Sequence, residues 1–94
     1  FGDSFFEFLI MEKKYLQRNA AIALGNHANP DHVPILIEAL ETQNDELVRG
    51  AAAWALGKIS TPDARAALEK FFTQDPSEAV HSEIQGALDR MQKQ

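Results

Sequence analysis

The sequence predicts an all-α protein, a short right-handed solenoid of stacked helix pairs, and three observations point to it. The chain resembles itself at one fixed period, of about 32 residues, and its apolar residues follow helical spacing. No stretch alternates apolar and polar residues with the period of a strand. We therefore expect about five to six helices and no sheet.

The repeat becomes visible when the sequence is shifted by one period, and no gap is needed. Identical residues then align in the pairs Ala20/Ala52, Ala21/Ala53, Ala23/Ala55, Leu24/Leu56, Gly25/Gly57, Pro30/Pro62, Asp31/Asp63 and Leu36/Leu68. A shorter third copy aligns Val48, Ala55 and Leu56 with Val80, Ala87 and Leu88. Similarity at a fixed period is typical of an array in which each unit buries its apolar face against the next.

Each unit contains two helical patterns, and the first helix of the second unit is apolar on two sides. Ala51 and Trp54 extend its apolar stripe onto a neighbouring face, which indicates a helix sandwiched between others. The alanines let neighbouring backbones approach closely, and Gly25 and Gly57 are assigned a structural role in the same repeat. Trp54 is expected to belong to the core.

These patterns divide the chain into a lead helix over 1–13, repeats over 14–44 and 45–74, and a capping helix over 75–94. The second helices are expected to begin at Asn29-Pro30 and Thr61-Pro62, because Asn and Thr cap helices and proline suits a first turn. Asp75 is expected to cap the last helix, and Asn26 to cap the end of the first repeat's first helix.

Composition narrows the function classes. With 94 residues, 45% apolar and 24% charged, the chain suits one small globular domain. We expect this domain in the cytoplasm. No apolar run suits a transmembrane helix, and the acidic residues near the start of the chain argue against a signal peptide. The absence of cysteine excludes disulfides, cysteine nucleophiles and iron–sulfur ligation in this segment. A net charge of −5 is opposite to that of most nucleic-acid binders, so such contact would require a local basic patch.

The lead segment is apolar almost all round, with Phe5, Phe6 and Phe8 among its large residues. Such a helix needs cover on more than one side. Two interpretations stay open. Either the segment rests against a neighbouring domain absent from this sequence, or its aromatic residues close the first repeat.

The unit from Val48 to Phe71 resembles the HEAT-like repeats first named in phycobilisome lyases. A narrower resemblance joins "KKYLQRNAAIALGN" (Lys13–Asn26) with "VRGAAAWALGKI" (Val48–Ile59). These segments are similar to the C-terminal region of epoxyqueuosine reductase, and the resemblance covers nearly the whole chain. It departs from that family before the paired lysines, where Ile10, Met11 and Glu12 replace a frequent Trp-Arg-Gly, and after them, where Tyr15 replaces a proline.

The resemblance implies a parent enzyme of bacterial tRNA modification. In that family, cobalamin and two four-iron clusters reduce the epoxide of epoxyqueuosine at the tRNA wobble position. The cluster ligands are cysteines, so no cofactor and no metal is expected in this segment. The chain would be a non-catalytic domain that helps to position tRNA and packs on a missing N-terminal catalytic domain.

The candidate tRNA contacts are basic residues. Lys13, Lys14 and Arg18 form the dense basic cluster of the sequence, and Lys58 lies near a turn between helices. Lys and Arg side chains bind phosphate oxygens without reading sequence. The alternative is a solvated helix start. Two interpretations of Asn19 stay open: a structural role, or a place at the boundary with the catalytic domain.

Other candidates are interpreted structurally. Arg49 is expected to bridge helices within or between repeats, and His81 to take the same place one repeat later. His27, Asp31 and His32 are close in sequence, but they lack a fourth ligand, so no metal is expected. No nucleophile elbow, phosphate loop or paired carboxylates mark a catalytic site. Two alternative functions stay open: a protein-interaction scaffold that uses the groove of the second helices, and a fragment related to phycobilin lyases.

Overall fold

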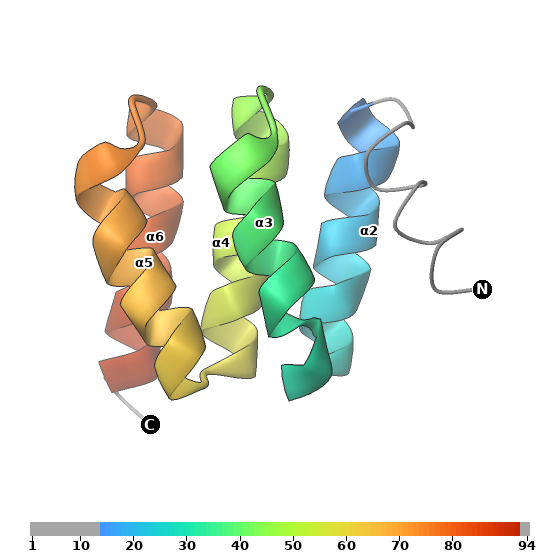
Figure 1. Cartoon of the computed structure of the whole chain (residues 1–94), viewed down its shortest axis with the longest axis vertical. Helices are drawn as coiled ribbons and strands as arrows, with labels where there is room; N and C mark the ends of the chain where they lie inside the picture. The colour runs from blue at the N-terminus through green and yellow to red at the C-terminus, as the bar shows by residue number, and fades with distance from the viewer. Residues whose placement is uncertain (1–13, 93–94) are drawn as a thin grey trace.

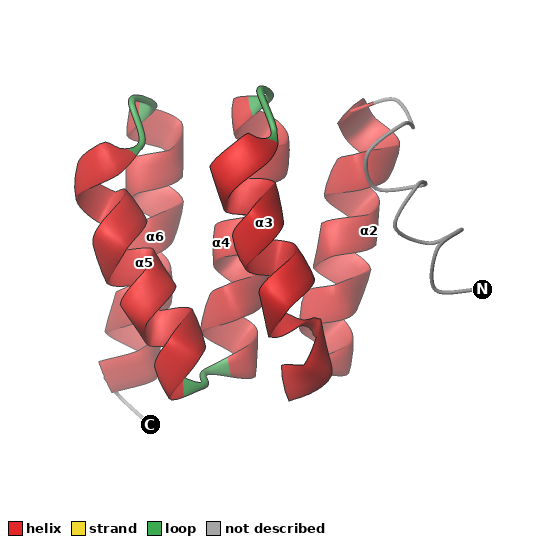
Figure 2. Ribbon diagram, in the orientation of Figure 1, coloured by secondary structure: helices red, strands yellow, loops and turns green. Residues whose placement is uncertain are grey.

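The computed structural model describes residues 14–92, with side chains from residue 19 onward, and this part of the chain consists of helices joined by short turns and loops. Its elements are α2 (Lys14–His27), the 3-10 helix η1 (Pro30–His32), α3 (Val33–Thr42), α4 (Glu46–Ile59), α5 (Pro62–Gln74) and α6 (Glu78–Gln92) (Figure 1). No strand occurs among the described residues (Figure 2). The predicted all-α class is confirmed. The predicted lead helix, with Phe5, Phe6 and Phe8, lies outside the described residues.

The helices form two layers, with α2, α4 and α6 in one and α3 and α5 in the other (Figure 1). The central helix α4 packs against all four other helices. This position explains its alanine-rich sequence, because a helix with neighbours on several sides has to bury several faces. Its buried residues are Val48, Gly50, Ala51, Ala52, Ala53, Ala55, Leu56, Gly57 and Ile59.

The helices of the first layer approach each other closely at the repeated glycines. A β-carbon on Gly25 would lie 2.8 Å from the Ala55 Cα, and one on Gly57 would lie 2.5 Å from the Ala87 Cβ. These distances are far below van der Waals contact, so only glycine fits at either position. The periodic glycines and alanines therefore set the spacing of α2, α4 and α6.

The ends of α2 and α4 are also equivalent, and the end of α2 differs from the prediction. Ala28 and Ser60, one repeat period apart, are both left-handed, with φ of 53° and 62°. The Ala28 N–H donates to the Leu24 carbonyl, and α2 continues past Asn26 to His27. The prediction that Asn26 caps this helix is wrong, because the left-handed residue that ends it stands two positions later.

The expected starts of the second helices are present at both positions. The Asn29 side chain accepts a hydrogen bond from the Asp31 N–H at 2.9 Å, and Thr61 Oγ1 accepts one from the Ala64 N–H at 3.1 Å. The first of these caps begins the 3-10 helix η1, and α3 follows directly from it. The second cap begins α5. The side-chain oxygens satisfy backbone donors that have no partner within the helix.

The final helix, α6, buries one stripe that contains Val80, Ile84 and Ala87. The prediction that Asp75 caps this helix is wrong. The helix begins at Glu78, and the Ser77 hydroxyl oxygen accepts the Val80 N–H at 3.3 Å. Asp75 ends the preceding helix instead, and its carboxylate is used for a contact with α4 that is described below.

Candidate nucleic-acid and partner-binding surfaces

The dense basic cluster of the sequence falls at the start of α2. Lys14 and Arg18 are four residues apart in its first turns, and Lys13 precedes the described residues. The structure does not describe the side chains of Lys14 and Arg18 either. Their contact with a nucleic acid therefore stays a prediction.

A second basic site appears where α4 and α6 end. Lys58 is exposed in the last turn of α4, and Arg90, its equivalent one repeat later, is exposed near the end of α6. The guanidinium of Arg90 reaches back toward α4, since its Nη2 lies 3.3 Å from the place where a Gly57 β-carbon would be. Neither cation forms an ion pair with a described residue. We call Lys58 and Arg90 the basic edge.

Sequence reasoning found Lys58 but missed Arg90. The signal was available, because the two residues are equivalent in the register of the repeat. Each cation also suits the negative end of its own helix dipole, which gives it a structural use beside any ligand. What the structure adds is that the side chain of Arg90 crosses toward α4 and brings the second charge to the same edge.

Trp54 connects the core with this edge. Its side chain is partly buried and packs against the core cluster. The Lys58 Nζ lies 5.8 Å from the centroid of the indole ring, within the range of a cation–π contact. The ring also stands beside Gly25 of α2. Trp54 therefore joins α2 to α4 while it keeps part of its surface open.

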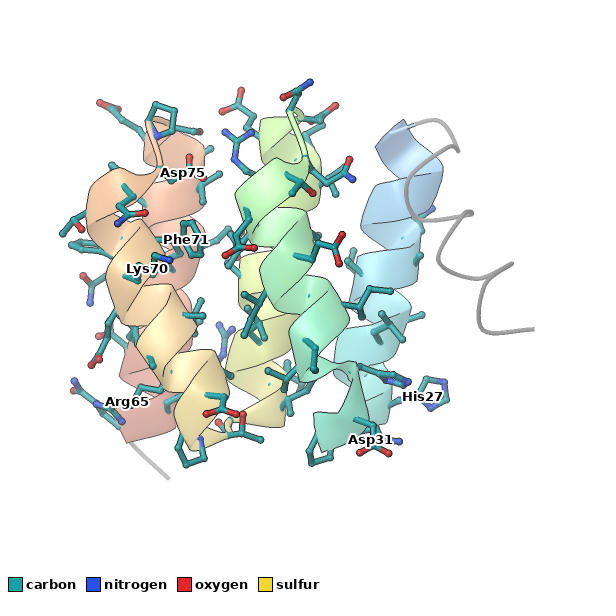
Figure 3. All side chains as sticks on the ribbon, viewed as in Figure 1. His27, Asp31, Arg65, Lys70, Phe71 and Asp75 are labelled. Atoms are coloured by element: carbon teal, nitrogen blue, oxygen red, sulfur yellow. The ribbon has the colours of Figure 1, made fainter. Side chains whose placement is uncertain are left out.

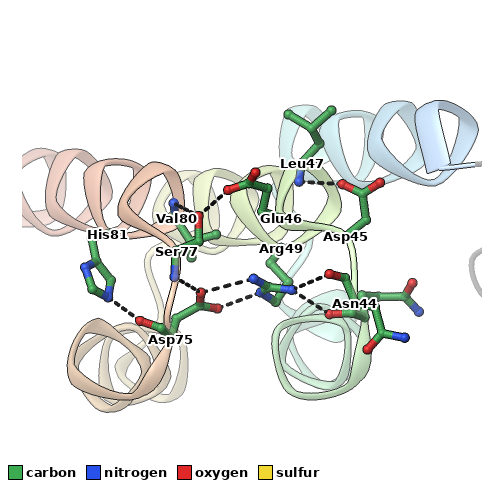
Figure 4. A network of polar contacts seen from close by, with 10 residues as sticks. Asn44, Asp45, Glu46, Leu47, Arg49, Asp75, Ser77, Val80 and His81 are labelled. Atoms are coloured by element: carbon green, nitrogen blue, oxygen red, sulfur yellow. Dashed lines mark hydrogen bonds and ion pairs between the residues drawn. The ribbon is translucent and has the colours of Figure 1, made fainter.

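Arg49 is the centre of a polar network between the repeats (Figure 4). Its Nε donates to Asp75 Oδ2 at 2.7 Å and its Nη2 to Asp75 Oδ1 at 3.2 Å. Its Nη1 donates to the carbonyls of Gln43 and Asn44, both at 2.9 Å. The Asp75 side chain is only 3% exposed. The guanidinium thus ties α4 to the loop before it and to the loop after α5, and it is not available to a ligand.

His81 is equivalent to Arg49 in the repeat and makes a similar contact. Its ring Nε2 is hydrogen-bonded to the Asp75 backbone carbonyl, as Arg49 is to the Gln43 carbonyl. Gln43 and Asp75 are themselves equivalent positions of the repeat. Each of the two side chains therefore closes the loop that precedes its own helix.

The outer face of α2 is open in the described part of the chain. Asn19 and Ala23 are exposed, whereas their equivalents in α4, Ala51 and Ala55, are buried. The difference follows from stacking order, because α4 has α2 on that side. Asn19 therefore lies on a surface that continues the packing face of the array.

Among the described residues, each of the two layers carries a groove. One, of about 500 Å³, is formed by the second helices and is lined by Val33, Pro34, Ile37, Asp63, Ala66, Ala67 and Lys70. This is the groove that the scaffold alternative requires. The other, of about 330 Å³, belongs to the first layer, and sequence reasoning did not predict it.

The described residues hold no group of three or more His, Cys, Asp or Glu side chains placed to bind a metal. His27 and Asp31 lie exposed around the α2–α3 turn, at the end of the molecule opposite Asp75 (Figure 3). His32 is partly buried, and its Nδ1 has no hydrogen-bond partner. Among the described residues, no helix has the length and apolar character that a membrane span requires.

The fold and its register define the class of protein. Residues 3–89 match the HEAT repeats family, and the chain belongs to it. This result confirms the HEAT-like repeats that the sequence predicted.

Individual proteins that are similar to this chain in sequence include enzymes. The epoxyqueuosine reductase of Bacillus subtilis is 35% identical over 77 residues, which is 82% of this chain and 20% of that protein. The epoxyqueuosine reductase of Bacillus cereus is 38% identical, with the same shares. The resemblance to this family is thus confirmed, and the chain spans about a fifth of the length of these relatives.

A solved structure extends the comparison. Human deoxyhypusine hydroxylase, in complex with glycerol, superimposes with a TM-score of 0.86 at 29% identity, over 95% of this chain and 31% of that one. The chain is therefore similar in sequence to one named enzyme, epoxyqueuosine reductase, and in structure to another, deoxyhypusine hydroxylase. The common feature is the repeat fold, so function has to be argued from the surfaces of this chain.

Proposed function

We propose that this chain is the HEAT-repeat domain of an epoxyqueuosine-reductase-like enzyme, that it supplies no catalytic group, and that it helps to position tRNA. The observation that carries the proposal is the identity of 35–38% to such reductases over about four fifths of the chain. The iron–sulfur clusters of the parent enzyme would belong to the remaining four fifths of its length, because this chain has no cysteine to ligate them, and we propose that cobalamin binds there as well.

The basic edge supports a phosphate-binding role. Lys58 and Arg90 are exposed, have no acidic partner among the described residues, and stand on neighbouring helices. Phosphate contacts position a nucleic acid without reading its sequence, which is what a positioning domain requires. Because the whole chain carries a net charge of −5, attraction has to be local, so we expect weak binding that depends steeply on salt.

The open face of α2 supports packing on a catalytic domain. Exposed Asn19 and Ala23 occupy positions that are buried in the next unit. A further element placed there would continue the same helix stacking. Asn19, in place of the alanine found in α4, offers this partner a hydrogen-bonding side chain.

The test is the affinity of the 94-residue chain for a tRNA with a G-U-N anticodon, measured over a range of salt concentrations. Binding should weaken with salt, with a slope of about −0.7 to −0.9 on a log–log plot for each phosphate contacted. Replacement of Lys13, Lys14 and Arg18 with Glu should abolish it while helicity is retained. A control variant, Lys70→Glu, changes one exposed charge on the other layer and should have a much smaller effect. No binding at low salt would count against the proposal.

A protein-interaction scaffold is the second candidate, favoured by the groove of about 500 Å³ between α3 and α5 and by the net charge of −5. The partly exposed Ile37 lies in its lining. If this candidate holds, Ile37→Asn should impair partner binding while any tRNA affinity stays unchanged. The reverse pattern would favour the tRNA role.

A further inference from the structure

The layer formed by α2, α4 and α6 carries a second, mainly apolar groove of about 330 Å³ that neither the repeat nor the tRNA proposal uses. We call it the outer groove. Its lining is Ile22 of α2, Glu46, Leu47, Gly50, Ala51 and Trp54 of α4, and Ala79 and Glu83 of α6. Gly50 and Ala51 are buried and small, so they form the bottom of the groove, and the larger side chains form its sides.

The apolar part of this groove is open to solvent. Leu47 is 53% exposed, and it is one of two large apolar residues that are exposed in the described part of the chain. Trp54, two helical turns later in the same lining, is only partly buried. Apolar side chains that gather on a surface in this way mark an interaction site, since their exposure to water is unfavourable.

The repeat does not require these residues. In the register of the repeat, Leu47 is equivalent to Tyr15 and Ala79, and Trp54 is equivalent to Ile22 and Gly86. The last helix of the array, α6, therefore folds with much smaller residues at both positions. The groove exists because this unit has large residues where its neighbour has Ala79 and Gly86.

The charge of the groove defines the kind of partner. Among the described residues, its lining contains two carboxylates, Glu46 and Glu83, and no lysine or arginine. Glu46 accepts a hydrogen bond from the Ser77 hydroxyl, and neither glutamate is in an ion pair with a described residue. A partner that places cations beside its apolar side chains would match this arrangement, and one with acidic side chains would be repelled.

We propose that the outer groove binds an amphipathic α-helix of another protein, with large apolar residues three and four positions apart and Lys or Arg beside them. Such a helix lays its apolar face in a groove in a well-known mode of peptide recognition. Its apolar side chains would cover Leu47 and Trp54, and its cations would face Glu46 and Glu83. The proposal is independent of the tRNA role.

Trp54 provides a direct readout, because it is the single tryptophan of the chain. The probe is a synthetic helical peptide without tryptophan that has leucines at i, i+3, i+4 and i+7 and lysines on both flanks. It should change the Trp54 emission saturably. A peptide of the same length with glutamate in place of every lysine should bind at least tenfold more weakly.

Matched variants separate this groove from general attraction to an acidic chain. Glu46→Gln with Glu83→Gln should weaken binding about fivefold or more, and Leu47→Ser should weaken it as well. Glu38→Gln with Glu41→Gln removes the same charge from exposed positions of α3 and should have little effect. Equal effects of the two double variants, equal affinity for the two peptides, or no saturable change in emission would overturn the proposal.

Discussion

The two junctions within the first layer, α2 with α4 and α4 with α6, share their closest contact but differ beside it. Gly25 meets Ala55 at the first junction, and Gly57 meets Ala87 at the second. Beside Gly25 stands the ring of Trp54, whose Cζ3 would be 2.7 Å from a β-carbon there. Beside Gly57 stands the guanidinium of Arg90.

The difference follows from a single position of the repeat. The equivalent of Trp54 in α6 is Gly86, which has no side chain to fill the space. Arg90, one turn later on α6, lies over that space, with its Nη1 3.8 Å from where a Gly86 β-carbon would be. The comparison of the two junctions shows that positions identical between repeats set the helix spacing. Positions that differ decide whether a junction presents an aromatic or a cationic surface.

The largest expected effect concerns the polar network that ties the second repeat to the first. Asp75→Ala should lower the free energy of unfolding by about 3–4 kcal/mol, because it leaves the nearly buried Arg49 without its carboxylate partner. Urea denaturation measures this value. The control is Gln43→Ala at the equivalent position, where only the backbone carbonyl is used, and it should cost less than about 0.5 kcal/mol. Similar losses in both variants would contradict the role given to the Asp75 carboxylate.

The shared contact itself can be tested at the second junction. Gly57→Ala should destabilise the protein by about 3 kcal/mol, since the new methyl group would lie 2.5 Å from the Ala87 Cβ and 3.0 Å from the Ala87 Cα. The two helices would have to move apart. The midpoint of thermal unfolding followed by circular dichroism reports the change. A neutral result would mean that the glycine does not set the helix spacing.

The smallest effect is expected at the position that differs. Gly86→Ala introduces the same methyl group where the nearest neighbour is the flexible end of Arg90 at 3.8 Å. Alanine is the better helix former, so stability should rise by about 0.5–1 kcal/mol. The same denaturation experiment measures it. A loss as large as that of Gly57→Ala would show that the two glycines are equivalent after all.

Much of this fold could be predicted because the same structural residues recur in successive repeats of the sequence. Glycine, alanine and proline recur at one fixed period, and each recurrence corresponds to a contact or a helix start in the structure. The helix ends were harder to predict. Ala28 and Ser60 adopt the left-handed conformation without glycine, so the usual signal of a helix end is missing at both.

The surfaces were predicted less well, for a spatial reason. Asp75 suits a helix cap as well as an ion pair, and only the position of Arg49 across the repeat decides between them. The sequence shows Arg90 only as a charged residue on the last helix. Its position beside Gly57 depends on the packing of α6 against α4. The outer groove combines residues of three helices, and no local pattern indicates such a site.

The most direct test of the account is the tRNA affinity of Lys58→Glu with Arg90→Glu, measured together with the stability of this variant. Both residues are exposed, but each reversal places an acid at the negative end of a helix dipole, so the free energy of unfolding should fall by about 1–2 kcal/mol while the variant stays folded. Affinity for a G-U-N tRNA should fall at least tenfold, and the slope of its salt dependence should become shallower by about two phosphate contacts. Unchanged affinity and slope in a folded variant would contradict the claim that this edge positions tRNA.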